Sequence, residues 1–374
     1  MNKVSVLFTG DFCPQLRIEE LVLQKRYSEI FNNFLPEFKK SDLNVIDLEC
    51  PLLTDGSKIK KTGPHLKAHP NCVEAIRFAG IDVVALANNH IRDYGEKGIA
   101  ETIAHCKRVG IEPVGAGHNL EEAREPLILT RKDIRIAFLN ITENEWSNSK
   151  GSDAGANPLD LPKNFSDLQK AKEKSDFVIV IFHGGNEFYE LPSPRLKETM
   201  RFFVEAGAAA VLCHHTHIVS GFEVYRDAPI FYGLGNFCFD WPGHHNSFWN
   251  IGMAVRLHLG DTVSFEIIPF KQNGAEPGVF LLTQSEQKIF DQRVEQLNTI
   301  ISDDKKIAEK FENYCAEKNE IYNIYLEPYR ISWLASLRRR HWIPSLFSKQ
   351  KKRLILNITR CESHRDVFMK YLEK

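Results

Sequence analysis

Residues 177–187 read FVIVIFHGGNE, an apolar run that gives way at once to a polar cluster. A short run without alternating polar residues is typical of a strand that is buried on both faces, as in the parallel sheets of α/β proteins. The polar cluster begins with His183, directly where the predicted strand ends. The stretch therefore predicts a buried parallel sheet whose strands lead into a polar site.

Similar apolar runs recur along the chain up to about residue 270. We predict further strands at Val4–Thr9, Leu43–Leu48, Asp82–Ala87, Ile134–Ile141, Ala208–Cys213 and Pro229–Tyr232. Segments with a helical pattern lie between them, at Pro70–Ala79, Gly98–Val109, Asp167–Lys174 and Pro194–Ala206. Several of these are followed by a glycine, which favours the left-handed conformation that ends a helix.

Residues 250–270 have a different pattern, which predicts an antiparallel hairpin that turns at Gly260 and Asp261. Together with the alternating strands and helices, this hairpin predicts an α/β fold. We expect a sandwich of mixed sheets with helices on the outside.

Five polar clusters fall where predicted strands give way to loops. They are Gly10-Asp11, Asp47-Leu48-Glu49, Asn88-Asn89-His90, residues 183–187 and His214-His215-Thr216-His217. Sites in open α/β sheets assemble just beyond the carboxyl ends of the strands. Clusters at five such ends can therefore converge on one crevice.

The side chains of these clusters have the chemistry of metal ligands. Carboxylate oxygens, a carboxamide oxygen and imidazole nitrogens together suit Mn²⁺, Fe or Zn²⁺. The six predicted ligands are Asp11, Glu49, Asn89, His183, His215 and His217. One ion needs three or four protein ligands, so six predict two divalent ions that share a carboxylate. His215 and His217 are the firmest pair, because a two-residue spacing on an extended segment places both imidazoles on one side.

Each residue taken alone has a simpler interpretation. Asp11 can cap a turn, Glu49 can be a solvated loop residue, and a single His183 can be a hydrogen-bonded structural histidine. His244 and His245 lie in a loop rich in Trp, Pro and Gly, so we expect them at the surface or facing a substrate. The five clusters considered together, and no single residue, predict the metal site.

Composition excludes several classes of protein. A hydrophobic content of 43% supplies a packed core and argues against global disorder. A net charge of −1 provides no overall attraction to nucleic acid or to an anionic membrane. We predict no transmembrane helix, and the eight cysteines form no CxxC pair. Without a secretion signal, we expect reduced thiols and a cytoplasmic protein.

At the polar clusters the sequence resembles the CapA family, the capsule-synthesis proteins associated with bacterial poly-γ-glutamate. The resemblance runs through TGDFCP, DLECPL, LANNHIRDYGEKGI, VGAGHNLEEAREP, FHGGNEF, HHTHIVSGFEVY and PIFYGLGNF, in that order, over residues 4–270. That family belongs to the calcineurin-like metallophosphoesterase superfamily. The resemblance implies a metallophosphoesterase-like αββα sandwich in residues 1–283. Residues 284–374 would form a helical, basic C-terminal extension without a family motif.

The resemblance also implies a role for each site residue. Asp11 and His217 would hold the first ion, Glu49 would bridge, and Asn89, His183 and His215 would hold the second. His90 would protonate the leaving oxygen or stabilise charge in the transition state. Asp93 and Glu187 would orient imidazoles, and Asn236 would line the crevice.

Two positions depart from the superfamily pattern. Cys13 stands two residues after Asp11, where the superfamily has a His. Either the Cys13 thiolate binds the first ion and favours Zn²⁺, or that ion is short of a ligand. Cys213 and His214 stand where a Gly-His pair is usual, so the orientation of His214 stays open.

We expect a hydrolase that acts on a phosphoester or on a capsule or cell-envelope polymer linkage. The alternative is a non-catalytic factor that binds the capsule polymer or a partner enzyme. The basic C-terminal segment and Cys13 favour this alternative. A nuclease and a nucleic-acid partner are disfavoured by the neutral charge and the lack of an aromatic-basic groove pattern.

Residues 329–353 interleave Trp333, Leu334 and Trp342 with clusters of Arg and Lys. Such a segment can lie on an anionic membrane, although Pro344 argues against one continuous helix. The other interpretation, which we favour, is a tail whose apolar residues pack on the main domain.

Overall fold

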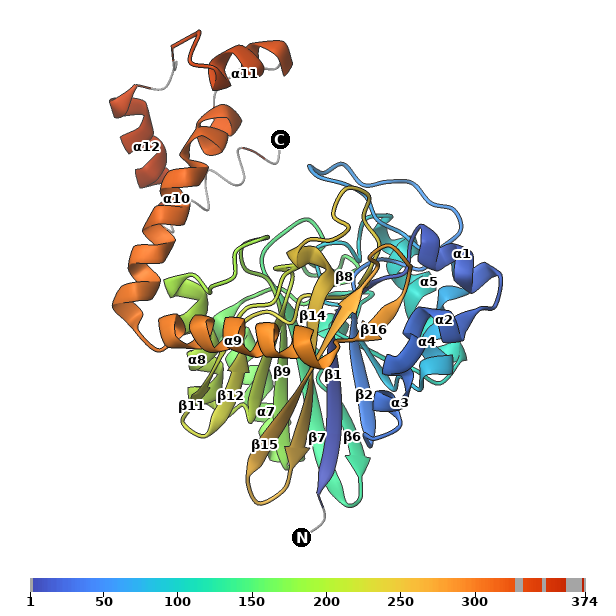
Figure 1. Cartoon of the computed structure of the whole chain (residues 1–374). Coiled ribbons are helices and arrows are strands. Elements are labelled where there is room, and N and C mark those ends of the chain that lie inside the picture. Colours follow the sequence, from blue (N-terminus) through green and yellow to red (C-terminus); the bar gives the residue numbers. More distant parts are fainter. Residues whose placement is uncertain (1–2, 327–331, 345–347, 361–371, 373–374) are drawn as a thin grey trace. The chain divides into compact units, whose positions relative to one another are not determined.

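The structure is a computed structural model that describes residues 3–326, 332–344, 348–360 and 372 (Figure 1). The chain divides into two compact units, residues 1–307 and residues 308–374. All six predicted metal ligands belong to the first unit.

The first unit is built on two large sheets. The first sheet has the strand order β16-β15-β14-β1-β2-β3-β4, and β13 also pairs with β1. Its strands are β1 (Val4–Cys13), β2 (Leu43–Leu48), β3 (Val83–Ala85), β4 (Glu112–Val114), β13 (Asn236–Phe239), β14 (Ile251–Leu259), β15 (Val263–Gln272) and β16 (Val279–Leu281). The second sheet has the order β11-β12-β10-β9-β7-β6. Its strands are β6 (Leu127–Arg131), β7 (Ile134–Thr142), β9 (Phe177–His183), β10 (Ala210–His214), β11 (Phe222–Tyr225) and β12 (Ala228–Phe231).

Both sheets are mixed. Strands β1 to β4 run parallel, and β14 and β15 extend that sheet as the predicted antiparallel hairpin. In the second sheet β7, β9, β10 and β12 are parallel, with β6 and β11 antiparallel at the edges. A short pair, β5 (Ala116–Gly117) and β8 (Gly155–Ala156), lies apart from both. The predicted α/β class with mixed sheets is confirmed.

Successive side chains of the central strands point to opposite faces of each sheet. The core therefore consists of one layer between the sheets and one layer under the helices on each side. In β1, Phe8 packs between the sheets in the same cluster as Ile179 and Ile181 of β9, whereas Leu7 belongs to the cluster on the helical side. In β9, Val180 joins the opposite helical layer. Because each central strand is covered on both faces, its sequence is mostly apolar and does not alternate regularly with polar residues.

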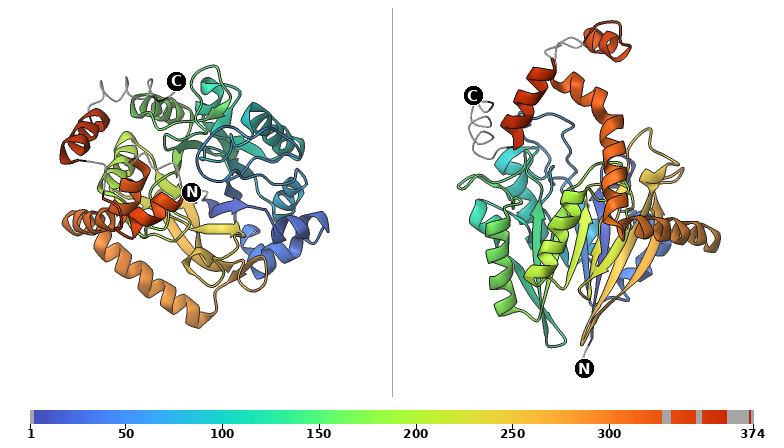
Figure 2. Two further views of the ribbon diagram at one scale, coloured as in Figure 1. Left: turned by 90° about the horizontal axis from the view of Figure 1, so that it is seen from above. Right: turned by 90° about the vertical axis from the view of Figure 1, so that its left-hand side faces the viewer.

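Helices cover the outer faces of the sheets, which gives the αββα order (Figures 1 and 2). On the first sheet they are α1 (Arg17–Leu23), α2 (Tyr27–Phe31), α3 (Leu35–Phe38), α4 (Cys72–Ala79) and α5 (Gly95–Arg108). On the second sheet they are α7 (Leu161–Lys174) and α8 (Pro194–Ala206). Helix α6 (Leu120–Arg124) packs on the small β5–β8 pair.

Helix ends follow local chemistry. The Ser193 side chain accepts a hydrogen bond from the Leu196 amide at the start of α8, and Gly207 ends the helix with a left-handed φ of 112°. Helix α7 begins at Leu161, earlier than the predicted Asp167. The Asp160 side chain caps this extra turn by accepting from the Lys163 amide, and a proline follows in the first turn.

Strand β1 continues to Cys13, beyond the predicted end at Thr9. The continuation is explained by β13, which pairs in parallel with the last residues of β1 and brings Asn236 opposite Asp11. Since β13 lies more than two hundred residues later in the chain, no local pattern could indicate this pairing.

Gly10 marks a close approach between these segments. A methyl group there would lie 1.8 Å from the Gly235 carbonyl oxygen, which accepts a hydrogen bond from the Asp11 amide at 3.1 Å. We expect Gly10→Ala to lower the free energy of unfolding by about 3 kcal/mol, because neither backbone segment can yield without losing strand pairing. Urea unfolding checks this. Gly274→Ala is the matched control, since its added methyl would meet nothing within 4 Å. Equal stability of the two variants would contradict the tight crossing.

Helix α9 (Gln284–Ile301) belongs to the first unit, although its charged sequence suggested an extension that starts at residue 284. Its residues Phe290 and Val294 join the core between the sheets, and Leu297 and Ile301 join the layer of α7 and α8. The division between compact units therefore falls after Ile307, one helix later than the change in sequence character.

Among the described residues, α9 is followed by α10 (Asp304–Leu326), α11 (Ser332–Arg339) and α12 (Lys349–Arg360). None of the helices in the described part of the chain combines the length and the apolarity that crossing a membrane requires.

Candidate metal centre

The predicted ligands meet where the parallel strands of both sheets end. Asp11 lies in β1 opposite Asp47 of β2, and Glu49 follows β2 directly. In the second sheet His183 and His214 are the last residues of β9 and β10 and pair in register. The site thus lies between the two sheets at their carboxyl ends.

Asp11 is fully buried and receives donors from the segment after β10. One oxygen is 2.9 Å from Nδ1 of His214, and the other accepts the amide of His215 at 3.1 Å and lies 3.4 Å from Nδ1 of His217. Burial alone would raise the pKa of Asp11, but the hydrogen bonds from His214 and His217 outweigh it and hold the pKa below its usual range. Asp11 is therefore ionised, and the donors of residues 214–217 stabilise its negative charge.

Glu49 lies at the centre of the group. Its two oxygens are 3.7 Å from Nε2 of His183, 3.9 Å from Nδ1 of His217 and 4.0 Å from Nε2 of His90. Both oxygens are buried, and neither has a hydrogen-bond partner among the described residues. Burial, followed by the charges of Asp11 and Asp47, raises the pKa of Glu49 well above its ordinary value. A buried carboxylate without donors is costly unless a cation compensates it.

His183 connects the two sheets. Its Nε2 lies 3.0 Å from Oδ1 of Asn89, and its Nδ1 lies 3.0 Å from Oδ2 of Asp47. Burial lowers the pKa of His183 to about 3, so its imidazole is neutral. The neutral ring is the form that binds a metal.

The segment from His215 to His217 differs from the prediction. An extended segment was expected to place both rings on one side, but the chain bends here, with left-handed φ values of 86° at His215 and 58° at His217. The bend brings the ring centroids of His215 to 5.0 Å from His183 and 5.9 Å from His217. Nδ1 of His215 is buried without a hydrogen-bond partner in the described part of the chain. Backbone strain of this kind is common at functional sites.

All six predicted ligands are therefore brought together, and their spacing fits metal ions. Separations of 3.7–3.9 Å between the Glu49 oxygens and the nitrogens of His183 and His217 are too long for hydrogen bonds. They are about twice the roughly 2 Å length of a bond from Zn²⁺ to nitrogen or oxygen. Three overlapping sets of side chains could each hold an ion: Glu49, His215 and His217; Asp11, Asp47 and His214; and Asp47, Glu49 and His183.

Two members of these sets were not among the predicted ligands. Asp47 lies two residues before Glu49 and holds Nδ1 of His183, while His214 binds Asp11. Burial raises the pKa of Asp47 well above its ordinary value, and the charge of Asp11 adds to this. The spacing of Asp47 and Glu49 was the available signal, because residues two apart point to the same side.

His90 is held at the rim of the group by Asp93. Its Nδ1 lies 2.7 Å from Oδ2 of Asp93, so Nε2 is left to face Glu49. A third residue, Lys61, forms a buried ion pair with the other Asp93 oxygen, and its Nζ lies 3.2 Å from Nδ1 of His90. Lys61 was not predicted.

We expect Lys61→Met to lower the free energy of unfolding by about 3 kcal/mol, because it leaves the buried Asp93 charge without its cation. The exposed pair Lys97–Glu101, at 3.6 Å, provides the control, and Lys97→Met should cost less than about 1 kcal/mol. Urea unfolding of both variants measures the difference. Similar small losses would show that Lys61 contributes little.

The remaining predicted residues differ in how they contact the group. Asn236 lies with its Oδ1 3.0 Å from Nδ1 of His217 and donates to the His217 carbonyl, so it holds that residue in its bend. Glu187 is exposed. Among the described residues, its carboxylate accepts no hydrogen bond from an imidazole. Its charge nevertheless acts on Glu49, His215 and His217.

Cys13, the last of the predicted site residues, is fully buried. It packs in the apolar layer between the first sheet and its helices, beside Cys50. Burial, then a hydrogen bond with Cys50, raises the pKa of the Cys13 thiol well above its ordinary value. None of the metal-binding sets found among the described residues includes it. The thiolate interpretation therefore has no geometric support.

Aromatic rings form one wall beside His217. Trp249 lies 4.7 Å from the His217 ring, and Phe188 and His244 stack on Trp249 at 5.8 and 5.0 Å. His245 instead contacts Asp240 at 3.1 Å. Of the two histidines in this loop, only His244 faces the wall.

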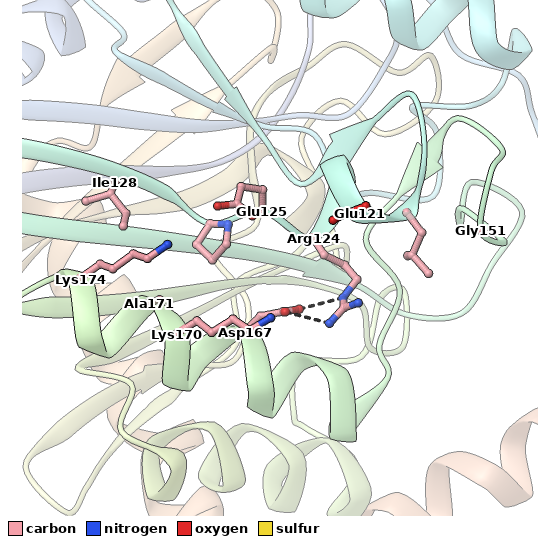
Figure 3. Close-up of a pocket in the computed structure, with 11 residues that line it drawn as sticks. Glu121, Arg124, Glu125, Ile128, Gly151, Asp167, Lys170, Ala171 and Lys174 are labelled. Atoms are coloured by element: carbon pink, nitrogen blue, oxygen red, sulfur yellow. Dashed lines mark hydrogen bonds and ion pairs between the residues drawn. The ribbon is translucent and has the colours of Figure 1, made fainter.

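A surface pocket of about 430 Å³ lies elsewhere, between α6 and α7. Figure 3 shows the Arg124–Asp167 ion pair in it, with Lys170 and Glu121 nearby. It contains none of the predicted site residues. Its paired charges of both signs offer no group of ligands comparable to that around Glu49.

Comparison with known proteins identifies relatives. Residues 5–241 match the family described as bacterial capsule synthesis protein PGA_cap. The capsule biosynthesis protein CapA of Bacillus anthracis is 30% identical over 289 residues, which cover 74% of this chain and 69% of that protein. The PGA biosynthesis protein CapA of Bacillus subtilis (strain 168) is 30% identical over 283 residues, 73% of each chain. A hypothetical protein from Thermus thermophilus aligns with a TM-score of 0.45 at 15% identity, over 71% of this chain and 99% of that one.

Proposed function

Because the chain belongs to the bacterial capsule synthesis protein family PGA_cap, we propose that it is a metal-dependent hydrolase with two divalent ions in the centre around Glu49. The observation that carries this proposal is Glu49 itself, a buried carboxylate whose two oxygens have no hydrogen-bond partner among the described residues and lie near several imidazoles. A carboxylate in this position can neutralise two cations at once.

The proposed metal ligands divide into two groups that share Glu49. Asp11 and His217 would hold one ion, and Asn89, His183 and His215 would hold the other. Asp47 and His214 would act on these ligands, because Asp47 fixes the ring of His183 and His214 donates to Asp11. The mixture of carboxylate, carboxamide and imidazole suits Mn²⁺, Fe or Zn²⁺. Such ions, when bound, polarise a substrate oxygen and lower the pKa of a water molecule.

His90 is the residue proposed to handle a proton. Asp93 fixes the ring through Nδ1, and Lys61 balances the charge of Asp93. Nε2 of His90 therefore keeps one orientation, toward the metal ligands, where it can donate a proton to a leaving oxygen.

The substrate class we propose is a phosphoester or a linkage of a capsule polymer. The relatives named for PGA biosynthesis and capsule biosynthesis support the polymer. A second candidate is a non-catalytic factor that binds or assembles an anionic polymer, supported by the basic C-terminal segment and no longer by Cys13.

The experiment is elemental analysis of purified protein, followed by a screen for metal-dependent cleavage of phosphoesters and γ-glutamyl polymers. We expect two equivalents of metal and a hydrolysis rate that disappears with a chelator and returns with the ion. Protein that contains metal but binds the polymer without cleaving it would favour the second candidate. Protein without metal affinity would contradict both the centre and the hydrolase.

We also propose a cytoplasmic location. Its support is a set of buried, unpaired thiols, which include Cys13, Cys50 and Cys72, since free thiols persist in a reducing compartment. Fractionation of cells that make the protein would check it.

A further inference from the structure

Charge is distributed very unevenly along this chain. Residues 332–360, which contain α11 and α12, include eight Arg and Lys residues and no Asp or Glu. Because the whole chain has a net charge of −1 and this segment has +8, the remainder carries −9. A concentration of positive charge in one short segment, in a chain whose remainder is acidic, indicates an anionic partner for that segment.

The same segment exposes large apolar side chains. The exposed fractions are 58% for Trp333, 70% for Trp342, 51% for Leu354 and 56% for Leu356. The packing of these residues on the main domain, which was the favoured expectation, stays a prediction. Exposed apolar side chains gain free energy only when a partner removes them from water.

Basic and apolar residues occupy separate stretches of each helix. In α12, Lys349, Lys351 and Arg353 are exposed at the start, and the apolar run Leu354–Leu356 follows. In α11, Trp333 is near the start and Arg339 is exposed at the end. Pro344 falls between the helices and belongs to neither, as its ring requires.

We propose that α11 and α12 bind the surface of an anionic lipid membrane. Lys and Arg would contact the head groups, while Trp342, Leu354 and Ile355 would enter the boundary between head groups and acyl chains. Nucleic acid and soluble polyanions match the charge equally well. They offer nothing, however, that removes Leu354 and Ile355 from water, and so the membrane is the occupant that accounts for both features.

The test is co-sedimentation of the full chain with vesicles of phosphatidylcholine alone and with vesicles that also contain phosphatidylglycerol. We expect binding to the anionic vesicles only, and less of it at high salt. A variant with Gln at Arg339, Arg340, Lys349, Lys351 and Arg353 should bind at least about a hundredfold more weakly, since each basic residue contributes about fivefold near such a surface.

Two further variants separate charge from insertion. Leu354→Ser with Ile355→Ser should weaken binding by about tenfold, because two apolar side chains no longer enter the boundary. The matched control removes the same number of charges elsewhere, with Gln at exposed lysines of the first unit, and it should bind like the unaltered chain. These lysines are Lys107, Lys170, Lys174, Lys288 and Lys305.

Three results would overturn the proposal. The first is an unaltered chain that stays in the supernatant with anionic vesicles at low salt. The second is equal binding to neutral and anionic vesicles. The third is displacement from vesicles by single-stranded DNA together with full binding by the double serine variant, which would assign the segment to nucleic acid. Circular dichroism of each variant verifies that helical content is unchanged. The proposal does not depend on the hydrolase activity.

Discussion

Replacing His90 by Asn is expected to lower turnover by about a hundredfold to ten-thousandfold while leaving the metal content unchanged. Losses of that size are typical when a general acid is removed. The metal should remain because His90 approaches Glu49 only to 4.0 Å and is held by Asp93, outside the proposed set of ligands. Asn retains a polar side chain of smaller size, so the buried rim should stay folded.

The measurement pairs steady-state kinetics with elemental analysis of the same preparation. His118→Asn is the control, because His118 is exposed and lies on the loop before α6, away from the proposed ligands. A variant that turns over normally would remove His90 from the proton-transfer step. A variant that loses metal would make His90 a ligand.

Glu49→Gln is expected to reduce metal affinity more strongly than Asn89→Ala does. A bridging carboxylate supplies negative charge to two cations, whereas the carboxamide of Asn89 supplies one neutral oxygen. The loss should exceed the roughly 10- to 100-fold that follows removal of a group that only supports a ligand.

In the metal-free protein, we expect Glu49→Gln to raise the free energy of unfolding. Burial already raises the pKa of Glu49 well above its ordinary value, so without a cation the carboxylate destabilises the fold. We therefore expect metal-free Glu49→Gln to unfold at a higher urea concentration than the metal-free parent. Metal titration measures the loss of metal affinity, and urea unfolding measures the gain in stability of the metal-free protein. Equal metal content in the Glu49→Gln and Asn89→Ala variants would refute bridging.

Much of the sheet architecture could be predicted because the central strands are buried on both faces. Leu43–Leu48 was predicted with both ends correct, and so was the helix Pro194–Ala206, which has a cap, a proline and a terminal glycine in its own sequence. The start of α7 was missed although its cap, Asp160, is local, but the larger errors occurred where a boundary depends on a distant partner. The end of β1 depends on β13, and residues 284–301 look like a separate helix until their apolar side chains are placed against the core.

The site could be predicted as a group of residues but only partly as a set of contacts. Strand ends located Asp11, Glu49 and His183, since the position of an end follows from the apolar pattern. The partnership of Asp47 with His183 spans 136 residues, and that of Asp11 with His214 spans 203. No spacing rule reaches across such distances.

Lys61 illustrates a different limit. It lies in a loop that also contains Lys58 and Lys60, and nothing in the sequence distinguishes the one ammonium group that enters the site. Cys13 shows the reverse case, in which a position beside a ligand is occupied by a residue that packs in the apolar core.

The supply of ligands by both sheets sets an order of events during synthesis on the ribosome. Asp11, Glu49 and Asn89 emerge early, but His183, His215 and His217 come from the second sheet, more than ninety residues later. Strand β1 must wait still longer, because its antiparallel neighbour β14 begins at Ile251. The proposed pair of ions therefore could not be held until about two thirds of the chain has been made, and Asp11 and Glu49 spend that interval without the histidines.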